Sequence, residues 1–310
     1  PLRLRRQRLM SISPPPYPAL DRATGAHVVV KHENHQPTGA FKVRGALNLL
    51  LRLTPDERAH GVTAFSTGNH AQAVAHAART TATPCTIVMT TDPNPTKADA
   101  VRDLGARLVL SGTTFDDARE HATALAAEDR SRLVSAANEP LLVAGVATAY
   151  LELLADAPDL DVLVVPVGGG SGAAAACLVA QALAPGLEVV AVQSAASPAA
   201  HDSWRARDLV ARPNTSRAEG LATGTGFALT QAVLREHLDD FVLVDDDTID
   251  RAAALYLTAA RTVAEGAGAA ALAAVLADPD RFAGRRVGVV CSGGNASPAE
   301  LRRVSAHLPR

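Results

Sequence analysis

Residues 161–184, DVLVVPVGGGSGAAAACLVAQALA, decide how the chain can fold. The stretch opens with a continuous apolar run, which is typical of a strand buried on both faces of a sheet. A cluster of glycines follows, and the alanine-rich segment after it has the composition of a helix. Glycines at such a turn let backbone N–H groups approach a ligand, and the helix N-terminus favours an anion, most often phosphate. A tight strand–helix turn without a ligand is the alternative interpretation.

The same alternation of strand and helix runs along most of the chain. Continuous apolar strands separated by helices indicate parallel sheets covered on both faces, so we predict an α/β fold with open parallel sheets. The predicted strands are 27–33, 61–67, 84–90, 106–112, 132–137, 161–167, 188–193 and 285–294, and the predicted helices are 39–53, 69–80, 95–105, 114–129, 141–156, 171–184, 248–264 and 268–278.

Composition sets the class of protein. The chain has 310 residues, 47% hydrophobic and 20% charged, with a formal net charge of −2, an ordinary balance for a soluble globular protein. There is no basic excess that would point to nucleic acid. The three cysteines lie far apart without a C-x-x-C pair, which favours a reducing compartment over a disulfide framework. We read no signal peptide and no membrane span, and therefore expect a cytoplasmic location.

Lysine is scarce: only Lys31, Lys42 and Lys97 accompany the many arginines. An arginine stays protonated at any working pH, whereas a lysine can lose its proton and act as a nucleophile or base. Lys42 lies in PTGAFKVRGA, residues 37–46, among small residues that a ligand could approach closely. A solvated helix lysine is the competing interpretation, and Lys31 and Lys97 share the scarcity.

Two further polar motifs follow predicted strands. STGNH, residues 66–70, begins a helix, where its side chains could cap the helix or cradle a carboxylate or ring oxygen. CSGGN, residues 291–295, ends the last strand and could contact a planar ligand or form a simple turn. These motifs, the glycine turn and the Lys42 segment all lie at strand ends, where open α/β sheets place binding sites.

The glycine turn also matches G-x-G-x-x-A, so an NAD-type dinucleotide site must be considered. Such a site requires an acid at the end of the next strand, which here ends in Gln193, while Glu188 lies at its beginning. No G-x-x-x-x-G-K-[ST] motif occurs. An NAD-dependent dehydrogenase stays open as an alternative of another class.

Taken together, the four motifs resemble the pyridoxal-phosphate enzymes of the tryptophan-synthase β fold, also called fold type II. Within that fold they are most similar to the threonine/serine dehydratase and serine racemase group, over about residues 13–300. The resemblance implies two open parallel-sheet α/β domains with pyridoxal phosphate in the cleft between them. The large domain would comprise 1–47 and 142–310, and the small inserted domain 48–141.

The resemblance also implies roles for individual residues. Lys42 would hold the cofactor as a Schiff base and later remove the Cα proton, and Thr67 stands where racemases carry a serine hydroxyl opposite the lysine. The other implied cofactor contacts are Phe41 beside the ring, Asn69 at the ring hydroxyl, Gly168, Gly169, Gly170, Ser171 and Gly172 at the phosphate, Glu265, and Ser292 at the pyridine nitrogen. The implied contacts of the substrate carboxylate are Ser66, Thr67, Asn69 and His70.

The implied activity is β-elimination of L-threonine, L-serine or a related 3-hydroxy amino acid to a 2-oxo acid and ammonia. Because the methyl group of Thr67 adds bulk, we rank racemisation below elimination. A serine racemase, a β-replacement synthase on the same fold and a cofactor-free binding protein are the alternatives. The resemblance further implies a homodimer that acts on a small amino acid, without nucleic-acid or membrane partners.

Some positions depart from the family pattern. Ser171 takes the fourth place of a loop that usually has four glycines in a row, EGAG at 265–268 lacks the Pro after Glu, and GVAT at 145–148 replaces Gly-Gln-Gly-Thr. Gln193 and Ala199 stand where metal-activated members have carboxylates, which hard divalent cations prefer. We therefore predict no Mg²⁺ or Ca²⁺ at this site. Since the sequence stops soon after CSGGN, we also expect no regulatory domain.

Overall fold

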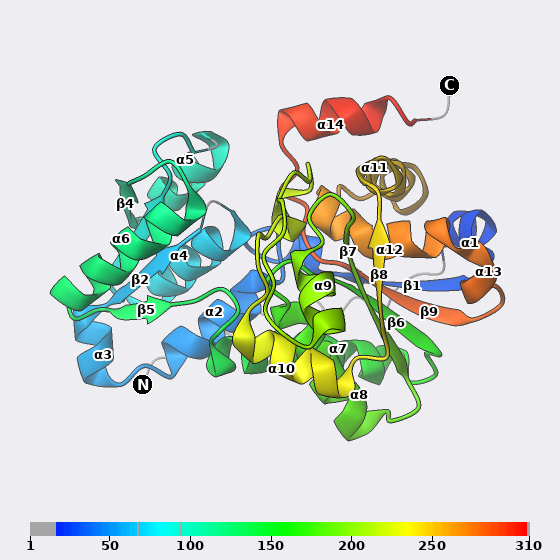
Figure 1. Cartoon of the computed structure of the whole chain (residues 1–310), viewed down its shortest axis with the longest axis horizontal. Helices are drawn as coiled ribbons and strands as arrows, with labels where there is room; N and C mark the ends of the chain where they lie inside the picture. Colours follow the sequence, from blue (N-terminus) through cyan, green and yellow to red (C-terminus); the bar gives the residue numbers. More distant parts are fainter. Residues whose placement is uncertain (1–16, 67, 94, 309–310) are drawn as a thin grey trace.

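Two parallel sheets organise the chain (Figure 1). The computed structural model describes residues 17–66, 68–93 and 95–308. The first sheet has the order β1 (His27–His32), β9 (Arg286–Cys291), β6 (Val162–Pro166), β7 (Glu188–Ser194) and β8 (Asp240–Val244). The second has the order β4 (Arg107–Leu110), β3 (Cys85–Met89), β2 (Val62–Phe65) and β5 (Arg132–Val134). All pairings between these strands are parallel, which confirms the predicted fold class.

Helices cover both sheets. Those that accompany the first sheet are α1 (Pro18–Thr24), α2 (Lys42–Leu51), α7 (Pro140–Asp156), α8 (Ser171–Leu183), α9 (Ala199–Ala206), α10 (Ala228–His237), α11 (Asp246–Leu255), α12 (Gly266–Ala277), α13 (Pro279–Phe282) and α14 (Pro298–Ser305). Those around the second are α3 (Pro55–His60), α4 (Asn69–Thr81), α5 (Pro95–Asp103) and α6 (Phe115–Glu128). Three short helical segments are η1 (Glu33–His35), η2 (Glu219–Leu221) and the π-helical η3 (Tyr256–Ala260).

The two faces of the first sheet bury different sets of helices. In β6, Leu163 and Val165 pack with α2, α7 and α8, whereas Val162 and Val164 pack with α11 and α12. Alternate side chains of a strand point to opposite faces, so a strand covered on both faces reads as one continuous apolar run. This burial explains why the sequence 161–167 shows no alternation of polar and apolar residues.

The strand ends place the four motifs at neighbouring positions. STGNH begins at Ser66, directly after β2, the glycines begin at Gly168, two residues after the end of β6, and CSGGN begins at Cys291, the last residue of β9. An isolated antiparallel bridge joins Ala40 to Gly293, so the chain just before Lys42 lies beside the loop that follows β9. The carboxyl ends of the strands and the start of α2 therefore share one region.

The structure adds elements that the sequence patterns did not predict. β8, α9 and α10 lie between 199 and 244, where no strand or helix was expected. Several side chains of β8 are only partly buried, so its apolar signal is weak. The predicted helix 248–264 belongs to α11, which begins at Asp246 and ends at Leu255, followed by the π-helical η3. No helix among the described residues is both long and apolar enough to cross a bilayer.

The second sheet lies within the predicted small domain, residues 48–141. Where one domain ends and the other begins stays a prediction.

Candidate functional site

Lys42 is the first residue of α2, and its amine meets two other segments. Nζ donates hydrogen bonds to Oγ of Ser171, 3.0 Å away, and to the carbonyl oxygen of Ala136, 3.2 Å away. The Phe41 ring lies against the same amine, with its centroid 5.0 Å from Nζ. Burial disfavours the charged form and lowers the pKa of Lys42 to about 8. This amine can therefore be deprotonated near neutral pH, as a nucleophile or base requires.

The glycine turn that follows β6 is closely covered. A Cβ added to Gly168 would lie 2.2 Å from the carbonyl oxygen of Gly220, and Gly170 adopts a φ of +87° that L residues rarely take. Oγ1 of Thr230 donates to the carbonyl oxygen of Gly169 over 2.8 Å, which fixes the turn. The turn leads into α8 at Ser171. The first N–H groups of a helix have no partner within it, so this N-terminus suits an anion.

We expect Gly168→Ala to destabilise the fold by about 1–3 kcal/mol, as overpacking of a filled site does. The new methyl group would meet the backbone at Gly220, which cannot turn aside like a side chain. Gly186→Ala is the matched control, because nothing lies within 4 Å of its added Cβ, and it should stay within about 0.5 kcal/mol of wild type. Urea unfolding compares the three proteins, and equal stabilities would contradict the close cover at Gly168.

Asn69, the first residue of α4, is held at both ends of its amide. Its Nδ2 donates to Oε1 of Glu265 over 2.5 Å, and its Oδ1 accepts a hydrogen bond from Nδ2 of Asn295 over 2.9 Å. The same Asn295 nitrogen donates to the carbonyl oxygen of Thr38. Burial raises the pKa of Glu265 to about 7, although Lys97 and the Asn69 hydrogen bond oppose the rise. These bonds fix which way the Asn69 amide faces.

Ser292 joins the loop after β9 to the lysine segment. Its carbonyl oxygen accepts a hydrogen bond from the N–H of Phe41 over 3.0 Å. Its buried hydroxyl donates to the carbonyl oxygen of Ala267 over 3.1 Å. A neutral hydroxyl, and not a carboxylate, therefore lies at this point of the site.

The residues of the STGNH motif differ in where their side chains point. Ser66 Oγ accepts a hydrogen bond from the N–H of Gly68 over 3.2 Å. The His70 ring is buried, with Nε2 3.1 Å from the carbonyl oxygen of Val134, and burial together with Lys42 lowers its pKa to about 4. The ring is thus neutral and directed at β5, so a carboxylate contact by His70 would fall to its backbone N–H. Thr67 lies outside the described residues.

Several residues of this region were not predicted from the sequence. Asn295 belongs to the CSGGN motif, and its side-chain amide next to the glycines was a usable signal. Thr230 and Ala136 gave none, since they act on the glycine turn and on Lys42 from distant segments. A buried ion-pair network beneath α2 was also missed; its members are Lys31, Glu33, Arg44 and Glu152.

Comparison with known proteins decides the family. The family described as pyridoxal-phosphate dependent enzyme matches residues 10–293. The chain belongs to this family.

Its relatives include enzymes of amino-acid deamination. It is 38% identical over 288 residues to an L-threonine ammonia-lyase of Thermotoga maritima, covering 92% of this chain and 71% of the relative. It is 34% identical over 278 residues to an L-threo-3-hydroxyaspartate ammonia-lyase of Saccharomyces cerevisiae, covering 89% and 85%. Among solved structures, the processed threonine deaminase isoform 2 of Solanum lycopersicum superposes with a TM-score of 0.89 at 29% identity, covering 96% of this chain and 83% of that one. The resemblance to the threonine/serine dehydratase group of fold type II is confirmed.

The residues of this site fit pyridoxal phosphate, which is the family's cofactor. Lys42 supplies a primary amine with a lowered pKa, and the N-terminus of α8 next to it favours a phosphate. This match replaces the dinucleotide interpretation of the glycine turn. The amide of Gln193, where metal-activated members have a carboxylate, accepts hydrogen bonds from the N–H groups of Ala200 and His201 and donates to the carbonyl oxygen of Leu221. The absence of a divalent cation there stays a prediction.

Proposed function

We propose that the chain catalyses the pyridoxal-phosphate-dependent β-elimination of a 3-hydroxy amino acid, L-threonine, L-serine or 3-hydroxyaspartate, to a 2-oxo acid and ammonia. The observation that carries the proposal is the Lys42 amine, with its pKa lowered to about 8, held 3.0 Å from Ser171 at the N-terminus of α8. The ammonia-lyase names of the relatives support the reaction class.

In this proposal Lys42 has two tasks. It holds the cofactor through its amine, and once released it takes the proton from Cα of the substrate. The bound cofactor supplies an electron sink for the negative charge that develops at Cα. A pKa of about 8 suits both tasks, since the amine must be neutral to act as a nucleophile or base and must then carry the proton.

The surrounding residues would bind and orient. Backbone N–H groups of the glycine turn and of Ser171 would hold the phosphate, Asn69 the ring oxygen and Phe41 one side of the ring. Ser292 faces the ring nitrogen in this proposal, and its proton already goes to the carbonyl oxygen of Ala267. A hydroxyl in this place does not protonate the ring nitrogen. Charge at Cα is then short-lived, which favours prompt loss of the β-hydroxyl group.

The substrate carboxylate would bind at the start of α4. This helix has 13 residues, and its N-terminus presents backbone N–H groups next to Ser66 and Asn69. Glu265 contributes by fixing the Asn69 amide. In this proposal the cofactor lies between a large domain of 1–47 and 142–310 and a small domain of 48–141. The contacts of Lys42 with Ala136 and of Asn69 with Glu265, each across this division, support that position.

A homodimer in the cytoplasm completes the proposal. The three cysteines are all free, which suits a reducing compartment.

A visible spectrum combined with a 2-oxo acid assay tests the function. Purified protein with pyridoxal phosphate is expected to show a visible band that shifts on addition of L-threonine, L-serine or L-threo-3-hydroxyaspartate, with 2-oxo acid formed in the same cuvette. EDTA should leave the rate unchanged. If the band shifts but none of the three amino acids yields 2-oxo acid, elimination is overturned in favour of racemisation or β-replacement. No band after addition of the cofactor would overturn the whole proposal.

A further inference from the structure

Lys97 is a buried lysine that links the two halves of the molecule. It lies in the first turn of α5, beside the second sheet, and only 8% of the residue is exposed. Its Nζ forms an ion pair with the Glu219 carboxylate of η2, which belongs to the first-sheet half. A cation in the first turn opposes the helix dipole, so the helix itself gives no reason for a lysine here. The reason lies across the interface.

The partner of Lys97 lies directly over the glycine turn. Gly220, next to Glu219, lies close to Gly168: a Cβ added to Gly168 would be 2.2 Å from the carbonyl oxygen of Gly220. The carbonyl oxygen of Leu221 accepts a hydrogen bond from Nε2 of Gln193 over 3.3 Å. An ion pair with Glu219 therefore ties α5 to the segment that covers the turn.

A second contact between the halves lies next to this ion pair, since a Cβ added to Gly220 would lie 2.6 Å from Cβ of Ala267, two residues after Glu265. Glu265, which accepts the Asn69 hydrogen bond, is buried, and the positive charge of Lys97 opposes the rise that burial gives to its pKa. Glu300 of α14 accepts a hydrogen bond from the N–H of Gly266 over 2.5 Å and interacts with Lys97 in the same way. Asn69 donates a hydrogen bond to Glu265, and Lys97, Glu219, Glu300 and Cys291 interact with it electrostatically. Lys97 is the one cation in this set.

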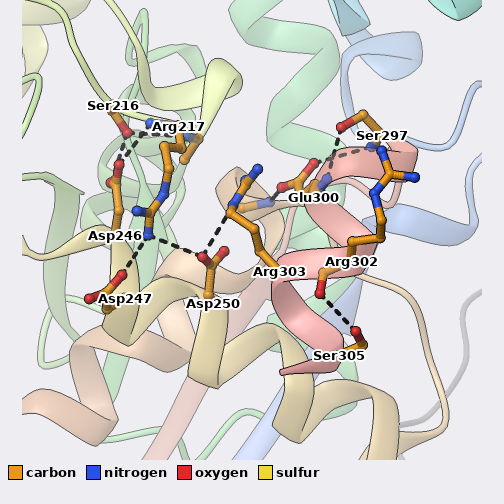
Figure 2. A network of polar contacts seen from close by, with 12 residues as sticks. Ser216, Arg217, Asp246, Asp247, Asp250, Ser297, Glu300, Arg302, Arg303 and Ser305 are labelled. Atoms are coloured by element: carbon orange, nitrogen blue, oxygen red, sulfur yellow. Dashed lines mark hydrogen bonds and ion pairs between the residues drawn. The ribbon is translucent and has the colours of Figure 1, made fainter. Parts of the chain in front are cut away.

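A network of hydrogen bonds and ion pairs joins the segment before η2 to α11 and α14 (Figure 2). Asp246 of α11 accepts hydrogen bonds from Oγ of Ser216, at 2.9 Å, and from the N–H of Arg217, at 2.7 Å, just before η2. Asp250 pairs with Arg217 at 3.1 Å and with Arg303 of α14 at 3.4 Å. This network therefore joins the segment just before Glu219 to α14, which carries Glu300, and Lys97 connects α5 to the same region through Glu219.

We propose that Lys97 is a positioning residue that fastens α5 to η2 over the glycine turn and sets the charge beside Glu265, so that Asn69 is held for the cofactor. Its role toward Asn69 rests on the proposed function, whereas the contact of α5 with η2 does not. Lys97 is not expected to touch the substrate.

Lys97→Met is the central variant, and Arg102→Met is its matched control on the same helix. Arg102 pairs with Asp99 within α5, and both side chains are more than half exposed. In the cofactor-free protein, hydrogen exchange of residues 95–103 should be about tenfold faster in Lys97→Met and unchanged in Arg102→Met. Lys97→Arg should restore slow exchange, because it keeps the charge.

Cofactor titration provides the second readout. Lys97→Met should bind pyridoxal phosphate about fivefold to tenfold more weakly. Without the cation, the pKa of Glu265 rises further, so the midpoint of any carboxylate-dependent change in cofactor affinity should move to higher pH. Arg102→Met should keep the wild-type affinity and midpoint, and Lys97→Arg should lie close to wild type.

Each outcome decides one part of the inference. Unchanged exchange of α5 in Lys97→Met would overturn the contact, and faster exchange with unaltered cofactor affinity and pH midpoint would overturn the positioning role. If Lys97→Met does not fold, Glu219→Gln removes the same ion pair from a side chain that is 57% exposed, and the same readouts apply. A wild-type protein that binds the cofactor but forms no 2-oxo acid would refute the proposed function, while these binding readouts still decide on Lys97.

Discussion

Lys42→Ala is expected to lower the formation of 2-oxo acid by about 10⁴-fold or more, the upper end of what a positioned proton-transfer group contributes. The variant also loses the amine that holds the cofactor, so the visible band of the bound cofactor should disappear. The other two lysines cannot take over, because Lys31 is paired with Glu152 and Lys97 with Glu219. Lys42→Arg should be equally inactive, since a guanidinium does not lose its proton. A variant without Lys42 that keeps the band and a tenth of the activity would contradict this role.

Replacing Lys42 by methionine should lower activity in the same way but raise stability. Burial lowers the pKa of Lys42 in the folded protein to about 8, from 10.5 in the absence of burial. Below pH 8 the ammonium is charged in both states, and its desolvation cost to the folded state is fully present. As the pH rises from 8 to 10.5 the folded state has lost this proton and the unfolded state has not, so stability increases in that window. The cofactor-free Lys42→Met variant should therefore be more stable than wild type at pH 7, and the difference should shrink toward pH 10.5.

This pair of measurements separates function from structure. If Lys42 served packing alone, its replacement would lower the stability and the activity of the protein together. Denaturant unfolding of the cofactor-free proteins at pH 7 and pH 10 checks the sign. A Met variant less stable than wild type at pH 7 would show that the amine is not desolvated as the structure indicates.

Local patterns predicted the part of the site that lies at strand ends. The turn after β6 and the loop after β9 follow apolar runs directly, and parallel strands bring their carboxyl ends to one edge of a sheet. Lys42 stood out through the scarcity of lysine, a property of the whole chain. These features required no knowledge of contacts between distant segments, which is why the sequence sufficed for them.

Contacts between distant segments had no such signal. The Lys97–Glu219 pair joins residues 122 positions apart, and nothing in either segment indicates the other. His70 shows a related limit, because its place in STGNH indicated a polar contact but not that the ring is directed at β5. β8 was not predicted because several of its side chains are only partly buried, so its sequence differs little in hydrophobicity from the neighbouring residues.

The second large effect is expected from Arg44, a buried residue of α2. Its guanidinium donates to both oxygens of Glu33, at 2.6 and 2.9 Å, and to both oxygens of Glu152, at 2.8 and 2.6 Å. Glu33 is 0% exposed. Burial lowers the pKa of Arg44, but these hydrogen bonds raise it by more, so the net shift is upward. Since Arg44 follows Lys42 by two residues on α2, the network also fixes the helix that carries the catalytic amine.

Arg44→Leu should destabilise the protein by about 3–5 kcal/mol, because the buried Glu33 carboxylate loses both hydrogen bonds of the guanidinium and keeps only the Lys31 ammonium, 3.9 Å away. Arg102→Leu is the control, as its exposed pair with Asp99 should contribute less than about 1 kcal/mol. The double variant Glu33→Leu with Arg44→Leu should recover much of the loss, because no unpaired charge remains and Lys31 still pairs with Glu152 at 2.6 Å. Urea unfolding of the four proteins measures this. A double variant no more stable than Arg44→Leu would show that the arginine acts by packing, whereas recovery would show that the cost lies in the stranded carboxylate.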